Sequence, residues 1–161
     1  MKKVNTSEVE ERDFESPKGV YAMHDINLSH ALGRDADSTD LNERHPFDVE
    51  ICRIPAGKKM CPYHSHSAQW EFYHVISGQG SVRDAEGHTP VTAGDAFLFK
   101  PGEAHQIIND SDADLVFYIV ANYPAGRVRS WWGQLSTRCS TGEPAGTTSF
   151  TGAQLPGHCR C

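Results

Sequence analysis

The sequence lacks a long hydrophobic run and an excess of basic residues, and each absence argues against a class of partner. The longest apolar run, residues 115–121, has the length of a strand, whereas a membrane-spanning helix needs about 20 apolar residues. Lysine and arginine number 15 against 21 for aspartate and glutamate, which gives a net charge of −6. Because phosphate binding needs clustered basic side chains, we expect neither a nucleic acid nor a membrane as a partner.

Cysteine is present, but not in a pattern that indicates disulfides. The five cysteines, an odd number without regular spacing, are most simply free thiols in a reducing compartment. His158, Cys159 and Cys161 offer three metal donors near the end of the chain, which is a weak signal for a site. Residues 1–10 contain two lysines with no apolar stretch behind them, so no secretory signal is recognisable and we expect a cytoplasmic protein.

Three regions of the chain differ in composition and in the pattern of apolar residues. Residues 1–45 form a charged N-terminal arm, in which weak alternation over 19–28 indicates one or two short strands. Residues 46–123 are dense in β-branched and aromatic residues, interrupted at short intervals by Gly, Pro, Asn and Asp, which is typical of many short strands joined by turns. Residues 124–161 form a C-terminal extension that becomes rich in Ser, Thr, Gly and Pro, and we expect poor order after about residue 136.

The middle region predicts an all-β barrel or sandwich, because it contains no helical periodicity of useful length. Pro90 is expected on an edge strand, since proline cannot donate to a ladder. The predicted strands cover residues 47–54, 63–66, 71–77, 81–84, 89–92, 95–100, 105–109 and 115–122.

The candidate metal ligands of this region are a pair of histidines and a glutamate that follows them. His64 and His66 stand two residues apart, so on an extended strand both imidazoles project from one face and can reach a single ion. Glu71 follows after a gap long enough for a turn, and its carboxylate can complete one side of the coordination sphere. The His-x-His spacing is a weak signal by itself, because single histidines are usually plain core or surface residues.

Two motifs in this region resemble those of the cupin family. The first is matched by Gly57, His64, His66, Glu71 and Gly78, with one extra residue between Gly57 and His64. The second is matched by Gly94, Gly102, His105 and Asn109. It departs from the family at one point, since Lys100 stands at the usual proline position and the proline follows at Pro101. The resemblance covers roughly residues 47–122.

The resemblance implies a double-stranded β-helix, a jelly-roll-like barrel, with one divalent transition metal in its wider mouth. The ion, which would be Fe, Mn, Ni or Zn, is expected on His64, His66, Glu71 and His105. Three imidazoles and a carboxylate suit a borderline first-row ion, and they differ from thiolate-rich structural zinc sites. Small cupins of this kind also imply a homodimer formed through N-terminal strands, for which residues 19–28 are the candidate. Trp131-Trp132 is expected to cover a barrel opening or the dimer seam, or to pack as ordinary core.

Four further residues are candidates for the surroundings of the metal. Strand alternation places Tyr73 on the face of Glu71, and Phe97 and Phe99 share one face of a neighbouring strand. These three predict a largely apolar pocket, and the alternative is that they are plain core. Gln69 is either a residue that holds a metal-bound water or a turn residue.

Two classes of function remain open for such a site. The first is a metal-dependent oxygenase acting on a small oxygen-rich organic substrate, or an isomerase or lyase in which the metal polarises a carbonyl. Metal-centred chemistry is favoured over side-chain acid–base catalysis, because the only carboxylate in the two motifs is a ligand. The second is a non-catalytic module that binds or senses a small molecule. Fold alone does not decide between them.

Overall fold

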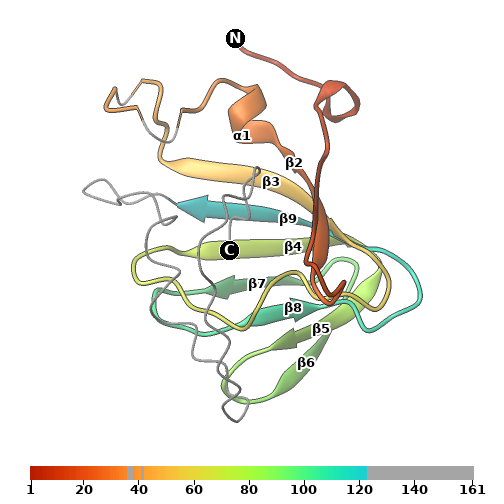
Figure 1. Cartoon of the computed structure of the whole chain (residues 1–161). Coiled ribbons are helices and arrows are strands. Elements are labelled where there is room, and N and C mark those ends of the chain that lie inside the picture. The colour runs from red at the N-terminus through yellow and green to blue at the C-terminus, as the bar shows by residue number, and fades with distance from the viewer. Residues whose placement is uncertain (36–37, 41, 123–161) are drawn as a thin grey trace.

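The computed structural model describes residues 1–35, 38–40 and 42–122. Within them the chain is almost entirely β-structure, arranged as two antiparallel sheets (Figure 1). The all-β fold class expected from the sequence is therefore confirmed. The C-terminal extension, with Trp131-Trp132 and the terminal His158, Cys159 and Cys161, lies outside the described residues.

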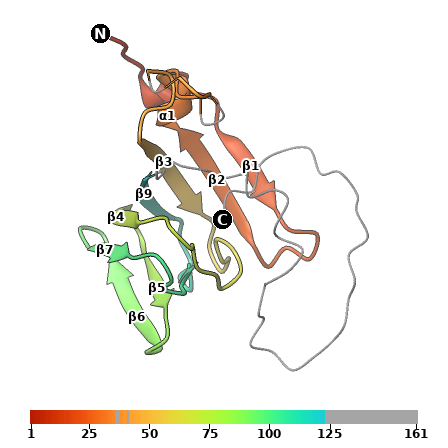
Figure 2. The same cartoon turned by 90° about the vertical axis from the view of Figure 1, so that its left-hand side faces the viewer.

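The larger sheet has six strands in the order β1-β2-β3-β9-β4-β7, and the smaller has three in the order β6-β5-β8. Figure 2 shows β1, β2 and β3 extending the larger sheet to one side of the region formed by β4 to β7. In chain order the elements are the 3-10 helix η1 (Thr6–Glu8), β1 (Arg12–Glu15), β2 (Ala22–Asn27), α1 (Leu28–Ala31), β3 (Phe47–Ile54), β4 (Glu71–Ser77), β5 (Gln79–Arg83), β6 (His88–Thr92), β7 (Ala96–Phe99), β8 (Gln106–Ile108) and β9 (Leu115–Asn122).

Most of the predicted strands are present, and three of them have the predicted bounds: β3, β4 and β9. Pro90 lies on β6, an edge strand of the smaller sheet, as expected. The strand predicted at 63–66 is wrong. That segment follows Pro62 and is irregular, and His64 makes only an isolated bridge with His105. The short helix α1 was not predicted, because four residues show no periodicity. Its N-cap is Asn27, whose side-chain oxygen accepts the backbone N–H of His30 at 2.7 Å.

The N-terminal arm joins the larger sheet of the barrel. β2 pairs along one edge with β1 and along the other with β3, both in antiparallel register. The strand predicted within 19–28 is therefore enclosed by strands of its own chain, and β1 is the edge of the sheet. The homodimer expected through this segment, and the division of the chain at residues 45 and 123, stay predictions.

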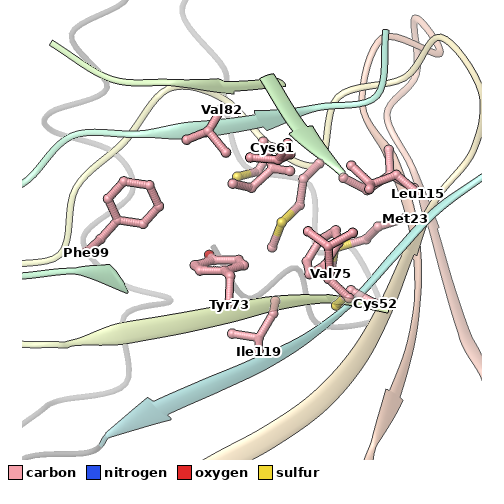
Figure 3. Packing of buried hydrophobic residues seen from close by; sticks show 14 residues of the cluster. Met23, Cys52, Cys61, Tyr73, Val75, Val82, Phe99, Leu115 and Ile119 are labelled. Carbon is pink, nitrogen blue, oxygen red and sulfur yellow. The ribbon is translucent and has the colours of Figure 1, made fainter. Parts of the chain in front are cut away.

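The core lies between the two sheets, and alternate residues of β3 and β9 are buried in it. On β9 the inward residues are Leu115, Phe117, Ile119 and Ala121, all buried. Figure 3 shows Val82, from the smaller sheet, across the core from Ile119. Burying the apolar side chains of both sheets against each other is the main favourable contribution to this arrangement.

Two of the motif residues have structural roles beside the turn that leads into β9. Gly78 has a φ of +84°, and a Cβ there would lie 2.2 Å from the backbone oxygen of Asp114, so no other residue fits. Asn109 is fully buried, and its side-chain amide donates to the backbone oxygens of Ile54 at 2.8 Å and Ala113 at 2.7 Å. Asn109 thus fastens the turn before β9 to the end of β3.

No helix in the described part of the chain has both the length and the apolar character that a membrane crossing requires.

Candidate metal centre

The structure brings the four sequence-predicted ligands into one cluster, which we call the metal cluster: His64, His66, Glu71 and His105. His64 and His66 lie in the loop between β3 and β4, Glu71 is the first residue of β4, and His105 directly precedes β8. Two backbone hydrogen bonds join His64 and His105, from His64 N to His105 O at 3.1 Å and from His105 N to His64 O at 2.7 Å. These bonds bring the two motifs together, even though the first histidine pair does not lie on a strand.

The donor atoms of the metal cluster have the spacing of ligands around one ion. All four lie within 4.8 Å of one another. His64 Nε2 lies 3.0 Å from His66 Nε2, His66 Nε2 lies 3.2 Å from Glu71 Oε1, and His105 Nε2 lies 3.0 Å from Glu71 Oε2. Neighbouring ligands at about 2.1 Å from an octahedral ion stand about 3.0 Å apart. The residues present therefore fit a single divalent metal.

The hydrogen bonds of two imidazoles direct their other nitrogens into the cluster. His64 Nδ1 lies 2.9 Å from the backbone oxygen of Pro62, and His105 Nδ1 lies 3.1 Å from that of Glu103. Because a carbonyl oxygen only accepts, each Nδ1 carries a proton and donates it. In the neutral ring Nε2 then holds a lone pair, and that lone pair faces other donors of the cluster. A positive charge between them, either extra protons or a metal ion, removes the repulsion.

The carboxylate of Glu71 is held ionised within the protein. Its side chain is 11% exposed, and those of His66 and His105 are 5% and 1% exposed. Burial alone would raise the pKa of Glu71. Hydrogen bonds from His105 and His66, when these rings are protonated, together with their charge, outweigh that effect and hold the pKa well below its usual range. The cluster is thus built to receive positive charge.

Aromatic rings surround the metal cluster on the side of β4 and β7. The ring of Phe99 stacks on His105, with centroids 3.9 Å apart and planes 2° from parallel. Tyr73 is buried and donates its hydroxyl proton to Glu71 Oε2 at 3.0 Å. Burial, with the charge of Glu71 next, raises the pKa of Tyr73 well above its usual value, so the phenol stays protonated. Phe97, half-buried, stacks on Tyr73. Tyr73 and Phe99 also belong to the core, so pocket wall and core are here the same residues.

Other residues singled out in the sequence lie at varying distances from the centre. Gln69 is half-buried in the loop that leads into β4, and its role with a bound water stays a prediction. The sequence left two interpretations open for Cys61, an approach to the site or a place as a small buried hydrophobe; Cys61 is buried, and its Sγ lies 3.4 Å from His64 Nδ1. Gln106 was missed; it is buried, and its amide donates to the backbone oxygen of Cys61 at 2.6 Å, which joins β8 to the loop carrying the histidine pair.

A second cluster of polar side chains is centred on β2 and β3, and we call it the arginine network. All its members are buried except the half-buried Arg12: Arg12, Asp25, Asn27, Arg34, Asp48 and Glu50. Arg34 Nη1 lies 3.2 Å from Asp48 Oδ2, and both side chains are buried. Arg12 pairs with Asp25 and approaches Glu50 Oε1 to 3.6 Å. A sequence signal existed for this cluster. In β3 the acids alternate with apolar residues, and the acids occupy the face that is otherwise the core.

Comparison with known families confirms the fold class. The family model described as a cupin domain matches residues 50–121, which include all four residues of the metal cluster. Residues 50–121 form a cupin domain. The two antiparallel sheets are accordingly the double-stranded β-helix expected of this family.

Individual relatives are similar over most of the chain. An oxalate-binding protein of Thermotoga maritima is 26% identical over 117 residues, which cover 73% of this chain and 90% of that protein. A sugar phosphate isomerase from a cupin superfamily, from Silicibacter pomeroyi, has a solved structure that matches with a TM-score of 0.62 and 26% identity, over 76% of each chain. The structure of a predicted oxalate decarboxylase from Thermotoga maritima matches with a TM-score of 0.61 and 23% identity, over 75% of this chain and 98% of that one, and shows the shared fold.

Proposed function

We propose that this cupin domain binds one divalent transition metal on His64, His66, Glu71 and His105 and uses it to hold a small oxygen-rich organic acid. The observation that carries the proposal is the convergence of three imidazole nitrogens and a carboxylate within 4.8 Å. The ligand set suits Fe, Mn, Ni or Zn, and a bound ion of this kind supplies Lewis-acid polarisation of a ligand's oxygen atoms.

A dicarboxylate such as oxalate is the first ligand to test. The similarity to an oxalate-binding protein supports this choice. Four protein ligands leave two positions of an octahedral ion open, which is the number that two carboxylate oxygens would fill. The chain itself excludes water from one side of the metal cluster. There the ring of Phe99 covers His105, and the ring of Tyr73 lies beside Glu71.

Catalysis by the bound metal is the further possibility, with oxygenase chemistry as the first candidate. The cluster's carboxylate, Glu71, is engaged by two imidazoles and the Tyr73 hydroxyl, so it is poorly placed to act as a free general base. That arrangement supports chemistry centred on the metal. Isomerisation of a sugar phosphate is the second candidate, supported by the similarity to an isomerase of Silicibacter pomeroyi.

Metal analysis of the purified protein, followed by calorimetric titration with oxalate, tests the binding proposal. We expect about one ion per chain, and oxalate binding that needs the ion. His105→Ala should lose both. His74→Ala is the matched control, because His74 is on β4 but its side chain alternates away from Glu71. Equal metal content in parent and His105→Ala would contradict the proposal.

Turnover assays then separate a binding module from an enzyme. Protein loaded with Fe(II) or Mn(II) is assayed for oxygen uptake with diols, catechols, dicarboxylates and diketones, and for interconversion of sugar phosphates. Oxygen uptake that depends on His105 indicates an oxygenase, and isomerised sugar phosphate indicates the isomerase. Tight retention of oxalate with no turnover under any metal indicates a binding or sensor module.

A further inference from the structure

We propose that Tyr73 is a positioning residue that holds the carboxylate of Glu71 in the orientation a metal ion requires. This inference rests on the proposed function, since it concerns how the metal cluster keeps its carboxylate in place. It gives Tyr73 a different role from a phenol that lines a pocket and waits for substrate.

The hydroxyl of Tyr73 is committed to Glu71. Both residues lie on the inner face of β4, two positions apart, and the hydroxyl donates to Glu71 Oε2 at 3.0 Å. Tyr73 is 1% exposed, so water cannot replace this partner without opening the core. A buried phenol that loses its acceptor is costly, so the bond is strongly maintained.

Packing fixes the ring that carries this hydroxyl. Phe97 lies parallel to Tyr73, with centroids 5.1 Å apart and planes 9° from parallel. Phe99 contacts the ring edge-on at 5.8 Å, and Phe117 contacts it at 5.7 Å. A tyrosine has two side-chain torsions, and rotation about the first would break all three contacts. The position of the oxygen is therefore set by the aromatic core and not by the metal cluster.

The bond divides the two oxygens of Glu71 between different neighbours. Oε2 accepts from Tyr73 and lies 3.0 Å from His105 Nε2, whereas Oε1 lies 3.2 Å from His66 Nε2. The terminal torsion of a glutamate is broad, so a carboxylate without the phenol can turn about its axis. Tyr73 restrains that turn, and each oxygen stays aimed at its own imidazole. Partners that orient ligands in this way typically change metal affinity by about 10–100-fold.

The test replaces the hydroxyl while keeping the ring. Tyr73→Phe is compared with Tyr118→Phe, which makes the same chemical change on β9, where Tyr118 alternates away from the inner face. Full-length proteins are titrated with Co(II) against a competing chelator, and the visible spectrum of the bound ion is recorded. We expect Tyr73→Phe to bind Co(II) about 10–100-fold more weakly, with a changed spectrum. Tyr118→Phe should match the parent in both readouts.

The outcomes separate this inference from the proposed function. A parent protein that binds no Co(II) contradicts the proposed function and the inference with it. A parent that binds Co(II), with a Tyr73→Phe variant of equal affinity and identical spectrum, overturns the role of Tyr73 and leaves the metal site intact. A merely structural role would lower stability without altering the spectrum of the ion that is bound.

A second variant keeps the test decisive if near-ultraviolet circular dichroism shows that Tyr73→Phe does not fold. Phe97→Leu retains the phenol but removes the stacked ring that fixes it, at a half-buried position. We expect Co(II) affinity between those of the parent and Tyr73→Phe, a loss smaller than about 10–100-fold. Affinity and spectrum equal to the parent would count against the positioning role.

Discussion

Glu71 of the metal cluster and Asp48 of the arginine network lie on the same inner face of the larger sheet, yet their charges are balanced in different ways. Glu71 and Asp48 are both cross-strand partners of Ala121, one on each side of β9. Asp48 is paired with the guanidinium of Arg34, a cation that the protein itself supplies. Glu71 is surrounded by imidazoles, which are neutral unless they acquire a proton. Buried charge alone therefore does not mark a site. The difference is whether the protein supplies the cation itself.

Removing one ligand of the metal cluster should have the largest effect on metal binding. His66→Ala should reduce bound metal from about one ion per chain to a trace, because two of the remaining donors lose a neighbour at coordination distance. Metal content after dialysis, measured by plasma mass spectrometry, checks this. Retention of the ion by His66→Ala would show that the ligand set is misassigned.

Removing Arg34 from the arginine network should lower the stability of the fold and leave metal binding unchanged. Arg34→Met leaves the buried Asp48 without its arginine, and we expect the free energy of unfolding to fall by about 3–5 kcal/mol. Urea denaturation of the metal-free protein measures the loss. Arg53→Met is the control, since Arg53 is 33% exposed and pairs with Glu11 and Asp114 at the surface, where about 1 kcal/mol or less is expected. Folded Arg34→Met that binds no metal would contradict the independence of the two clusters.

Adding the metal should stabilise the protein through one cluster only. At a free metal concentration of about 100 times the Kd, we expect about 2.7 kcal/mol of added stability, seen as a higher Tm that chelation reverses. Glu71→Gln should show little of this increase, while Arg53→Met should show all of it. An equal rise in Glu71→Gln would mean that the ion binds elsewhere.

The smallest effect concerns acid stability of the metal-free protein. Because the folded pKa of Glu71 lies below its ordinary value of 4.5, the unfolded chain binds this proton first as the pH falls. The contribution of Glu71 is therefore fully present above about pH 4.5 and is lost as the pH falls towards the folded pKa. Glu71→Gln should flatten the dependence of the unfolding free energy on pH below about 4.5, measured by urea denaturation. An unchanged slope would show that other carboxylates cause the acid sensitivity.

The sequence predicted three strands and the grouping of the histidines, but only the argument for the strands was correct. β3, β4 and β9 have their predicted bounds, because each is a run rich in β-branched and aromatic residues between turn residues. The argument that His64 and His66 share a strand face was wrong, since they lie in an irregular loop. The histidine pair meets His105 because the backbone of His64 pairs with that of His105. This contact joins segments far apart in the sequence, so local sequence pattern does not predict it.

The ion pairs of the arginine network could not be predicted from the sequence. Its acids on β3 follow a visible alternation, but their partners come from the N-terminal arm, where patterning is weak. Arg12 reaches its partners only because β1 pairs with β2. The same limit applies to Tyr73, whose placement on the inner face was predictable, while its hydrogen bond to Glu71 was not.

The ladder between β3 and β9 joins segments that lie far apart in the sequence. Among the described residues it is the longest pairing, eight residues on each strand, and every strand from β4 to β8 lies between its two halves in the sequence. Such nonlocal pairing must close a long loop before it gains stability, so folding is slow compared with that of helical proteins of this size. During synthesis, His64, His66 and Glu71 leave the ribosome well before β9. If the metal cluster binds an ion as proposed, a newly made chain would offer it only scattered ligands, and loading would follow closure of the barrel.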